Sequence, residues 1–160
     1  MALDILKVLV AHSPQSEIER DNNGYLSIHE AAEAAQSPEF FQVLIDTYPE
    51  SLGIIDPVNT LLSLHSACGQ HNSNLKTVRL LFDSYLEAIF IDDGRGRTPL
   101  DNAQRYGHEY VATFLENQHA FATTARDTTA IYTPDYNDWL PLHHALCDNA
   151  SLGSIKLLVS

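Results

Sequence analysis

Apolar residues recur along this chain with the spacing of one face of an α-helix. Five eight-residue stretches carry apolar side chains at their fourth, seventh and eighth positions, which is the i, i+3, i+4 pattern of a helix. The fifth position, on the opposite face, is mostly long and polar. The sequence therefore predicts five amphipathic helices, at residues 3–10, 38–45, 75–82, 108–115 and 152–159.

A second motif separates these predicted helices and occurs in four imperfect copies. Each copy opens with an aspartate, passes through a turn sequence and ends in a short segment of small residues such as Ala31-Ala32. Turn sequences such as Asp-Asn-Asn-Gly supply the residues with positive φ that a tight hairpin needs. A fixed period of this size indicates a stack of small units, none of which can bury its apolar face alone. The four copies begin at Asp21, Asp56, Asp93 and Asp135.

The third and fourth copies carry the residues that characterise the unit. Thr98-Pro99-Leu100 and Pro141-Leu142-His143-His144-Ala145 match the Thr-Pro-Leu-His-x-Ala signature of the ankyrin repeat. Residues 107–111 match the turn into its second helix. The chain thus resembles the ankyrin-repeat family over nearly its whole length. This resemblance implies an all-α repeat solenoid, an ankyrin-type stack of helix-turn-helix units joined by hairpin loops.

The units depart from the family pattern in spacing and at one key residue. The anchor position of the motif, usually histidine, is held by His29, His65, Asp101 and His143, which are 36, 36 and 42 residues apart, against a family period of 33. We expect Asp101 to weaken the bond from side chain to backbone that the histidine makes. The longer last interval places extra residues within 116–134, a Thr- and Ala-rich stretch that we expect to be a loop.

We read one domain over residues 1–160. Its expected units are a partial repeat at 1–20, repeats at 21–55, 56–92 and 93–134 with an insertion in 116–134, and a partial repeat at 135–160. Both ends are apolar helices without the polar outer face that terminal units of a solenoid need. Two interpretations stay open: the chain is a segment of a longer array, or another chain or a second copy caps each end. The second predicts end-to-end self-association.

The charge of the chain bears on its partners and its compartment. The net charge is −12, and the basic residues are scattered. This argues against nucleic acid, whose phosphates require a basic surface, and favours a basic partner. No apolar run approaches the ~18 residues of a membrane span, and the opening residues do not form a signal peptide. With two distant cysteines, the sequence predicts an intracellular protein, cytoplasmic or nuclear, with no membrane partner.

Two pairs of residues have a spacing that a catalytic or metal site could use. His143 and Cys147 lie four apart on one helical face and could offer two metal ligands, but no nearby residues supply the other two. His65 and Cys68 suggest a nucleophile pair, yet His29 occupies the same place in the first copy with alanine instead of cysteine. Because the histidine recurs at this position without the cysteine, we interpret it as structural. The sequence therefore predicts no enzyme activity, no catalytic residue, no metal and no cofactor.

The resemblance implies that partners are held by hairpin tips and the inner face of the first helices. The tip residue stands four before each anchor, and the set is rich in the Trp, Tyr and Arg that dominate binding hot spots. Such side chains could instead shield the core, and neighbouring aspartates could neutralise the arginine. We expect a module that binds a protein or peptide; the alternative is a structural spacer without a ligand. The expected partner-binding residues are Tyr25, Leu61, Arg97, Trp139 and Tyr136, which shares the last tip.

Overall fold

The computed structural model describes residues 2–13, 18–126, 134–135, 137–147, 151 and 155. Every regular element within these residues is helical. The α-helices are α1 (Ala2–His12), α2 (Ser27–Glu33), α3 (Pro38–Thr47), α4 (Ser63–Gly69), α5 (Leu75–Ser84), α6 (Pro99–Arg105), α7 (Glu109–Arg126) and α8 (Pro141–Cys147). Two 3-10 helices, η2 (Pro49–Gly53) and η3 (Leu86–Phe90), follow α3 and α5.

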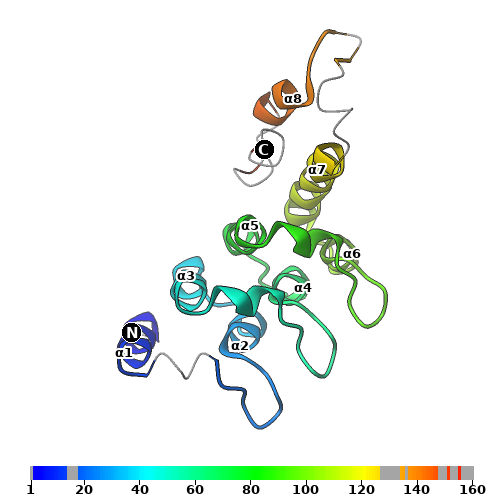
Figure 1. Ribbon diagram of the computed structural model, residues 1–160. Coiled ribbons are helices and arrows are strands. Elements are labelled where there is room, and N and C mark those ends of the chain that lie inside the picture. The colour runs from blue at the N-terminus through cyan, green and yellow to red at the C-terminus, as the bar shows by residue number, and fades with distance from the viewer. Residues whose placement is uncertain are drawn as a thin grey trace.

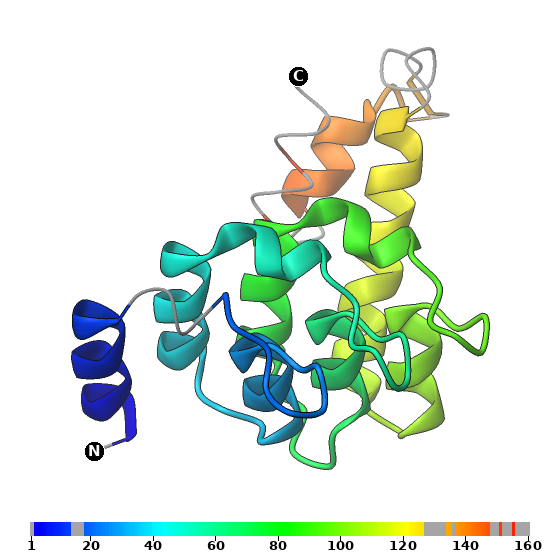
Figure 2. The ribbon, with the colours of Figure 1, turned by 60° about the horizontal axis from the view of Figure 1, so that its bottom comes forward.

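The helices form two layers, with successive units stacked along them. The short helices α2, α4 and α6 contact one another in sequence and make the inner layer. The longer helices α1, α3, α5 and α7 contact one another in the same way and make the outer layer. Figure 1 shows the two rows, with the hairpin before each inner helix projecting on the same side, and Figure 2 shows the same order from another direction. The predicted all-α repeat stack is confirmed.

The core lies between the two layers and follows the predicted register. The apolar positions of α3, α5 and α7 are buried, as the i, i+3, i+4 pattern requires. Phe82 and Phe114 meet edge to face with ring centroids 5.9 Å apart, and the guanidinium of Arg79 lies 4.9 Å from the centroid of the Phe114 ring. These core residues are Phe41, Leu44, Ile45, Val78, Leu81, Phe82, Val111, Phe114 and Leu115.

Helix α1 shares only part of this register. Leu6, its fourth position, is buried against the stack. Leu9, which the pattern places on the same face, is 57% exposed, and Ile5 and Val8 are similarly exposed. Within the described residues, α1 packs against the single outer helix α3, whereas α3 and α5 each have an outer helix on both sides. The last predicted helix, residues 152–159, lies outside the described residues except for Ile155.

The loop predicted at residues 116–134 is wrong in its first part, because α7 continues to Arg126. Phe114, Leu115, Gln118, Phe121 and Ala122 are all buried and lie on one helical face. The buried polar residue in the middle of this face hides the apolar period in the sequence. Its amide oxygen accepts a hydrogen bond from the Ser151 backbone N–H at 2.9 Å, which ties α7 to a later segment. The rest of the predicted loop, apart from residue 134, lies outside the described residues.

The sequence pattern also missed the two 3-10 helices. Both begin two residues after an outer helix ends, at Pro49 and Leu86. Leu52, Ala88 and Ile89 in these short helices are buried and belong to the core. A five-residue helix is too short to show a period.

Candidate functional site

Each hairpin is built around the carboxylate of its first aspartate. In the first, Asp21 Oδ1 accepts hydrogen bonds from the backbone N–H groups of Asn23 and Tyr25, at 2.9 and 2.8 Å. Its own N–H donates to the Tyr25 carbonyl at 2.9 Å and closes the loop. The bond from the Tyr25 backbone is the main reason that the pKa of Asp21 lies below its ordinary value. The carboxylate therefore fixes where the tip residue stands.

The other three hairpins repeat this arrangement. Asp56, Asp93 and Asp135 each accept from two or more backbone N–H groups, the last of which belongs to the tip residue. The hairpin at Asp56 holds one residue more than the others and has no glycine, so Thr60 takes the positive φ, at 54°. In the last hairpin Asp138 takes it, at 60°. The carboxylate holds the loop closed even where the turn lacks glycine.

The first two anchor histidines tie the start of an inner helix to the segment just before the next hairpin. His29 Nδ1 accepts from the Leu26 backbone N–H at 3.2 Å, while Nε2 donates to the carbonyl of Ile54 at 2.8 Å. His65 does the same with Leu62 and Ile91, at 3.2 and 2.9 Å. Burial is the main cause that lowers the pKa of His65 below its ordinary value. Both ring nitrogens are therefore occupied, and the ring is neutral near pH 7.

Asp101 does not weaken the local bond, and that prediction is corrected. Its Oδ2 accepts from the Thr98 backbone N–H at 2.8 Å, shorter than the corresponding bond to His29. Thr98 Oγ1 in turn accepts from the Asp101 backbone N–H at 3.2 Å, which completes a capping box. A carboxylate has no proton to donate, so Asp101 cannot make the second bond, to a carbonyl just before the next hairpin, that His29 and His65 make. The substitution thus affects that bond rather than the helix cap.

The predicted tip residues differ in how accessible they are. Trp139 is 41% exposed, and its ring lies 6.2 Å from that of His143 and 5.3 Å from that of His144, between centroids. Tyr25 is half-buried and meets the ring of His29 edge-on, at 6.2 Å. Leu61 is also half-buried. Tyr136 lies outside the described residues.

Arg97 is largely occupied within its own hairpin. Its Nε and Nη2 donate to Asp93 Oδ2 at 3.1 and 2.8 Å. Burial alone would raise the pKa of Asp93, but the hydrogen bonds from Arg97 and from the backbone bring it below its ordinary value. The alternative in which a neighbouring aspartate neutralises Arg97 therefore holds, and its side chain, 22% exposed, carries a charge that is already paired.

Two tips and three inner helices meet in one small groove, which we call the tip groove. Leu61 and Arg97 form its outer wall, and the inner helices contribute side chains from α2, α4 and α6. Its volume is about 90 Å³. Sequence reasoning identified the two tips but missed the inner-helix residues, which stand one, four and five positions after an anchor. Six residues that define it are Glu33, Leu61, Ser66, Arg97, Asn102 and Tyr106.

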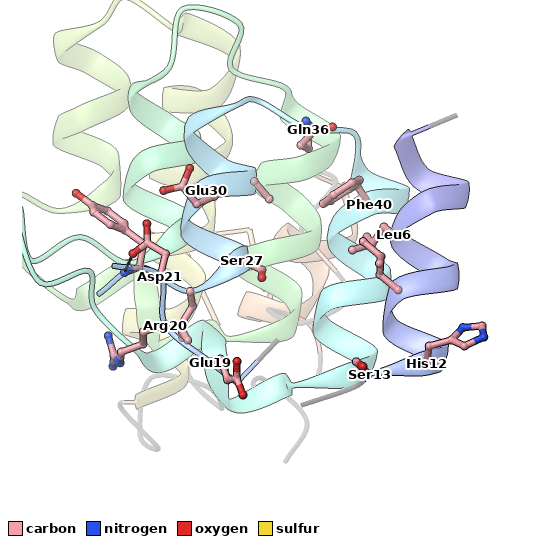
Figure 3. A pocket seen from close by; sticks show the side chains of 14 residues that line it. Leu6, His12, Ser13, Glu19, Arg20, Asp21, Ser27, Glu30, Gln36 and Phe40 are labelled. Atoms are coloured by element: carbon pink, nitrogen blue, oxygen red, sulfur yellow. Dashed lines mark hydrogen bonds between the residues drawn. The ribbon is translucent and has the colours of Figure 1, made fainter. Parts of the chain in front are cut away.

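A larger depression, the end groove, lies at the first end of the stack. It has a volume of about 600 Å³ and is bordered by α1, the first hairpin, α2 and the start of α3. Figure 3 shows Leu6 and Phe40 beside each other on its apolar side, with Glu30 across from them on α2. Within the described residues, α2 contacts an inner helix on one side only, α4. The end groove is the open end of the inner layer.

The comparison with known families agrees with this geometry. A model of ankyrin repeats matches residues 28–127 in three copies, which is more than half of the chain. The chain belongs to the ankyrin-repeat family. The match spans α2 to α7, and the fourth hairpin, at Asp135, lies beyond it. No match was found among curated proteins.

Ankyrin repeats are generally protein-interaction modules and typically carry no catalytic activity. Cys68 is fully buried, which raises the pKa of its thiol and keeps it protonated. Both cysteines are free, and within the described residues no three His, Cys, Asp or Glu side chains gather as a metal site would need. None of the described helices is both long and apolar enough to span a membrane.

Proposed function

We propose that this ankyrin-repeat chain binds a partner protein or peptide on the face formed by the inner helices α2, α4 and α6, which we call the concave face, with the hairpin tips as the outer contacts. The tip groove carries the proposal, because residues from three successive inner helices and two tips line a single depression. No single unit could form such a site.

The exposed tryptophan supports the same face. The Trp139 backbone N–H donates to Asp135 Oδ1, and its ring lies against the rings of His143 and His144, so ordering the side chain on binding costs little entropy. Exposed, rigid aromatics of this kind dominate binding hot spots, where loss of one costs ~2 kcal/mol or more. The net charge of −12 favours a basic partner and an association that weakens as salt rises.

Peptide selection on the purified chain would test this function. Random peptides displayed on phage would be selected against it, and the affinities of the selected peptides compared between Trp139→Ala and Tyr110→Ala. Tyr110 is a matched control, since it is an 85% exposed aromatic on the outer helix α7. We expect Trp139→Ala to weaken binding by tenfold or more, as ~2 kcal/mol implies, and Tyr110→Ala to leave it unchanged.

Two results would contradict the proposal. If no peptide or protein ligand binds at any salt concentration, the chain behaves as a spacer. If Tyr110→Ala weakens binding and Trp139→Ala does not, the partner sits on the outer layer instead of the concave face.

A further inference from the structure

The tip groove contains a buried hydrogen-bond acceptor that the chain itself does not satisfy. Asn102 is only 3% exposed, and its Oδ1 has no hydrogen-bond partner among the described residues. A buried carbonyl oxygen without a donor destabilises a fold, and most buried polar groups are paired for this reason. Asn102 lines the groove, but its Oδ1 has less than 1 Å² of accessible surface, so a donor from outside would supply the missing bond once the side chain turns toward the groove.

The groove also carries a negative charge that is not balanced from within. Glu33 stands at its edge on α2, and no described cation pairs with it. Burial first, and then the charges of Glu30 and Asp56, raise the pKa of Glu33 above its ordinary value, as expected where negative groups gather. The two basic residues of the lining cannot compensate. Arg97 is paired with Asp93, and His65 is neutral with both nitrogens bonded.

An aromatic ring and an aliphatic side chain complete the lining. Tyr106 is 50% exposed, and its ring lies so close to α4 that a Cβ added at Gly69 would be 3.3 Å from it. Glycine at that position is what allows the ring to rest there. Leu61 provides the aliphatic wall at the tip. A ligand entering the groove thus meets a carboxylate, a ring and an apolar surface, with the unpaired carbonyl oxygen of Asn102 just below the surface.

These four features suit one amino-acid side chain. The guanidinium of arginine is planar and always charged, presents five N–H donors in a fixed fork and stacks on aromatic rings. Its aliphatic stem packs on apolar surface. Lysine carries a compact, strongly hydrated charge that neither stacks nor donates in a plane.

We propose that the tip groove is a binding site for an arginine side chain of the partner, whose guanidinium donates to Asn102 and to Glu33. This inference rests on the proposed function, since it names the residue that the partner places on the concave face. It also accounts for Asn102: the residue is unsatisfied in the free chain because its hydrogen-bond donor arrives with the ligand.

The test is a titration of the ¹⁵N-labelled chain, followed by NMR, with N-acetyl-arginine amide as the probe. N-acetyl-citrulline amide is the matched uncharged control, and N-acetyl-lysine amide tests for a cation of another shape. With the arginine probe we expect saturable chemical-shift changes at Ser66, Gly69 and the Asn102 side-chain amide. The citrulline and lysine probes should bind at least about fivefold more weakly than the arginine probe.

Two variants locate the charge and the acceptor. Glu33→Gln should weaken the arginine probe about fivefold, whereas Glu39→Gln, which removes the same charge from the outer helix α3, should not. Asn102→Leu should abolish binding while raising the denaturation midpoint, because it removes an unsatisfied buried polar group. A residue with a purely structural role would lower the midpoint when changed.

The proposal is overturned if citrulline or lysine binds as well as arginine, if the two glutamate variants behave alike, or if Asn102→Leu destabilises the chain. These failures are separable from failure of the proposed function. Selected peptides that bind the concave face without arginine, and are insensitive to Glu33→Gln, would remove the arginine site and keep the interaction module. If the arginine probe binds but no peptide can be selected, the arginine site is kept and the interaction module is removed.

Discussion

Replacing Ala35 by glycine should stabilise the fold, because this alanine occupies a conformation that favours glycine. At the end of helix α2, the Gln36 N–H donates to the Ala31 carbonyl at 3.0 Å, and the Ala35 N–H donates to the Ala32 carbonyl at 3.2 Å. This pattern is a Schellman motif, and it puts Ala35 at φ 48°, in the left-handed region. Helix α6 ends with the same two bonds, but there the residue with positive φ is a glycine, Gly107, at 75°.

The magnitude follows from two opposing terms. The left-handed conformation costs a residue with a Cβ roughly 1–2 kcal/mol, and glycine removes that cost. Glycine also gives the unfolded chain more freedom, which takes back about 0.4–1 kcal/mol. Ala35 is exposed, so little burial is lost with its methyl group. We therefore expect Ala35→Gly to raise the free energy of unfolding by about 0.5–1 kcal/mol.

The reverse change in the third unit is its counterpart. A Cβ built at Gly107 has no heavy atom within 4 Å, so Gly107→Ala introduces backbone strain without a clash and should destabilise by about 0.5–1 kcal/mol. Ala34→Gly is the control for composition, because Ala34 lies at φ −79°, where alanine is favoured. That variant should be destabilised as well.

Urea denaturation followed by circular dichroism would measure all three variants, with the slope of the transition checked for constancy. The reasoning fails if Ala35→Gly lowers the free energy of unfolding, or if Ala35→Gly and Ala34→Gly shift it in the same direction. In either case strain at the end of α2 would not be the controlling factor.

Three further predictions concern the core, the pH dependence and the exposed end. Leu81→Ala should cost ~2–5 kcal/mol, since Leu81 is 1% exposed, and hydrogen exchange should quicken in the neighbouring units too; an unchanged denaturation midpoint would contradict the register of α5. Because the folded chain disfavours protonated His65, stability should be complete above the ordinary pKa of 6.5 and fall as pH drops through and below it; a His65→Gln variant with the same pH dependence in urea titrations would contradict this. Changing Ile5, Val8 and Leu9 together to serine should abolish any self-association of the chain seen by sedimentation, and dimers that persist in the variant would place the contact elsewhere.

Local sequence patterns predicted most of the fold, because the two helical layers are specified within each unit. The positions of Phe41 and Val78 follow from the apolar period alone, and the hairpins follow from their aspartates. The extension of α7 could not be predicted in this way, since Gln118 is a polar residue in the buried face and its partner, Ser151, is 33 residues away.

The candidate site was less predictable, because it depends on contacts between units. The tip positions could be counted from the anchors, and the pairing of Arg97 with an aspartate of its own unit was one of the alternatives. Glu33, Asn102 and Tyr106 come together only when α2, α4 and α6 are stacked. A comparison of the same position across units would have shown Asn102 where other copies have Glu30 and Ser66, yet not that its oxygen is unpaired.

The central claim is that partners bind the concave face. Hydrogen–deuterium exchange of the chain with and without the tightest selected peptide would test it most directly. We predict slower exchange in the hairpins around Leu61, Arg97 and Trp139 and in α4 and α6, with α3 and α5 unchanged on their outer surface. Protection confined to α1, α3 and α5, with the hairpins unaffected, would contradict the claim.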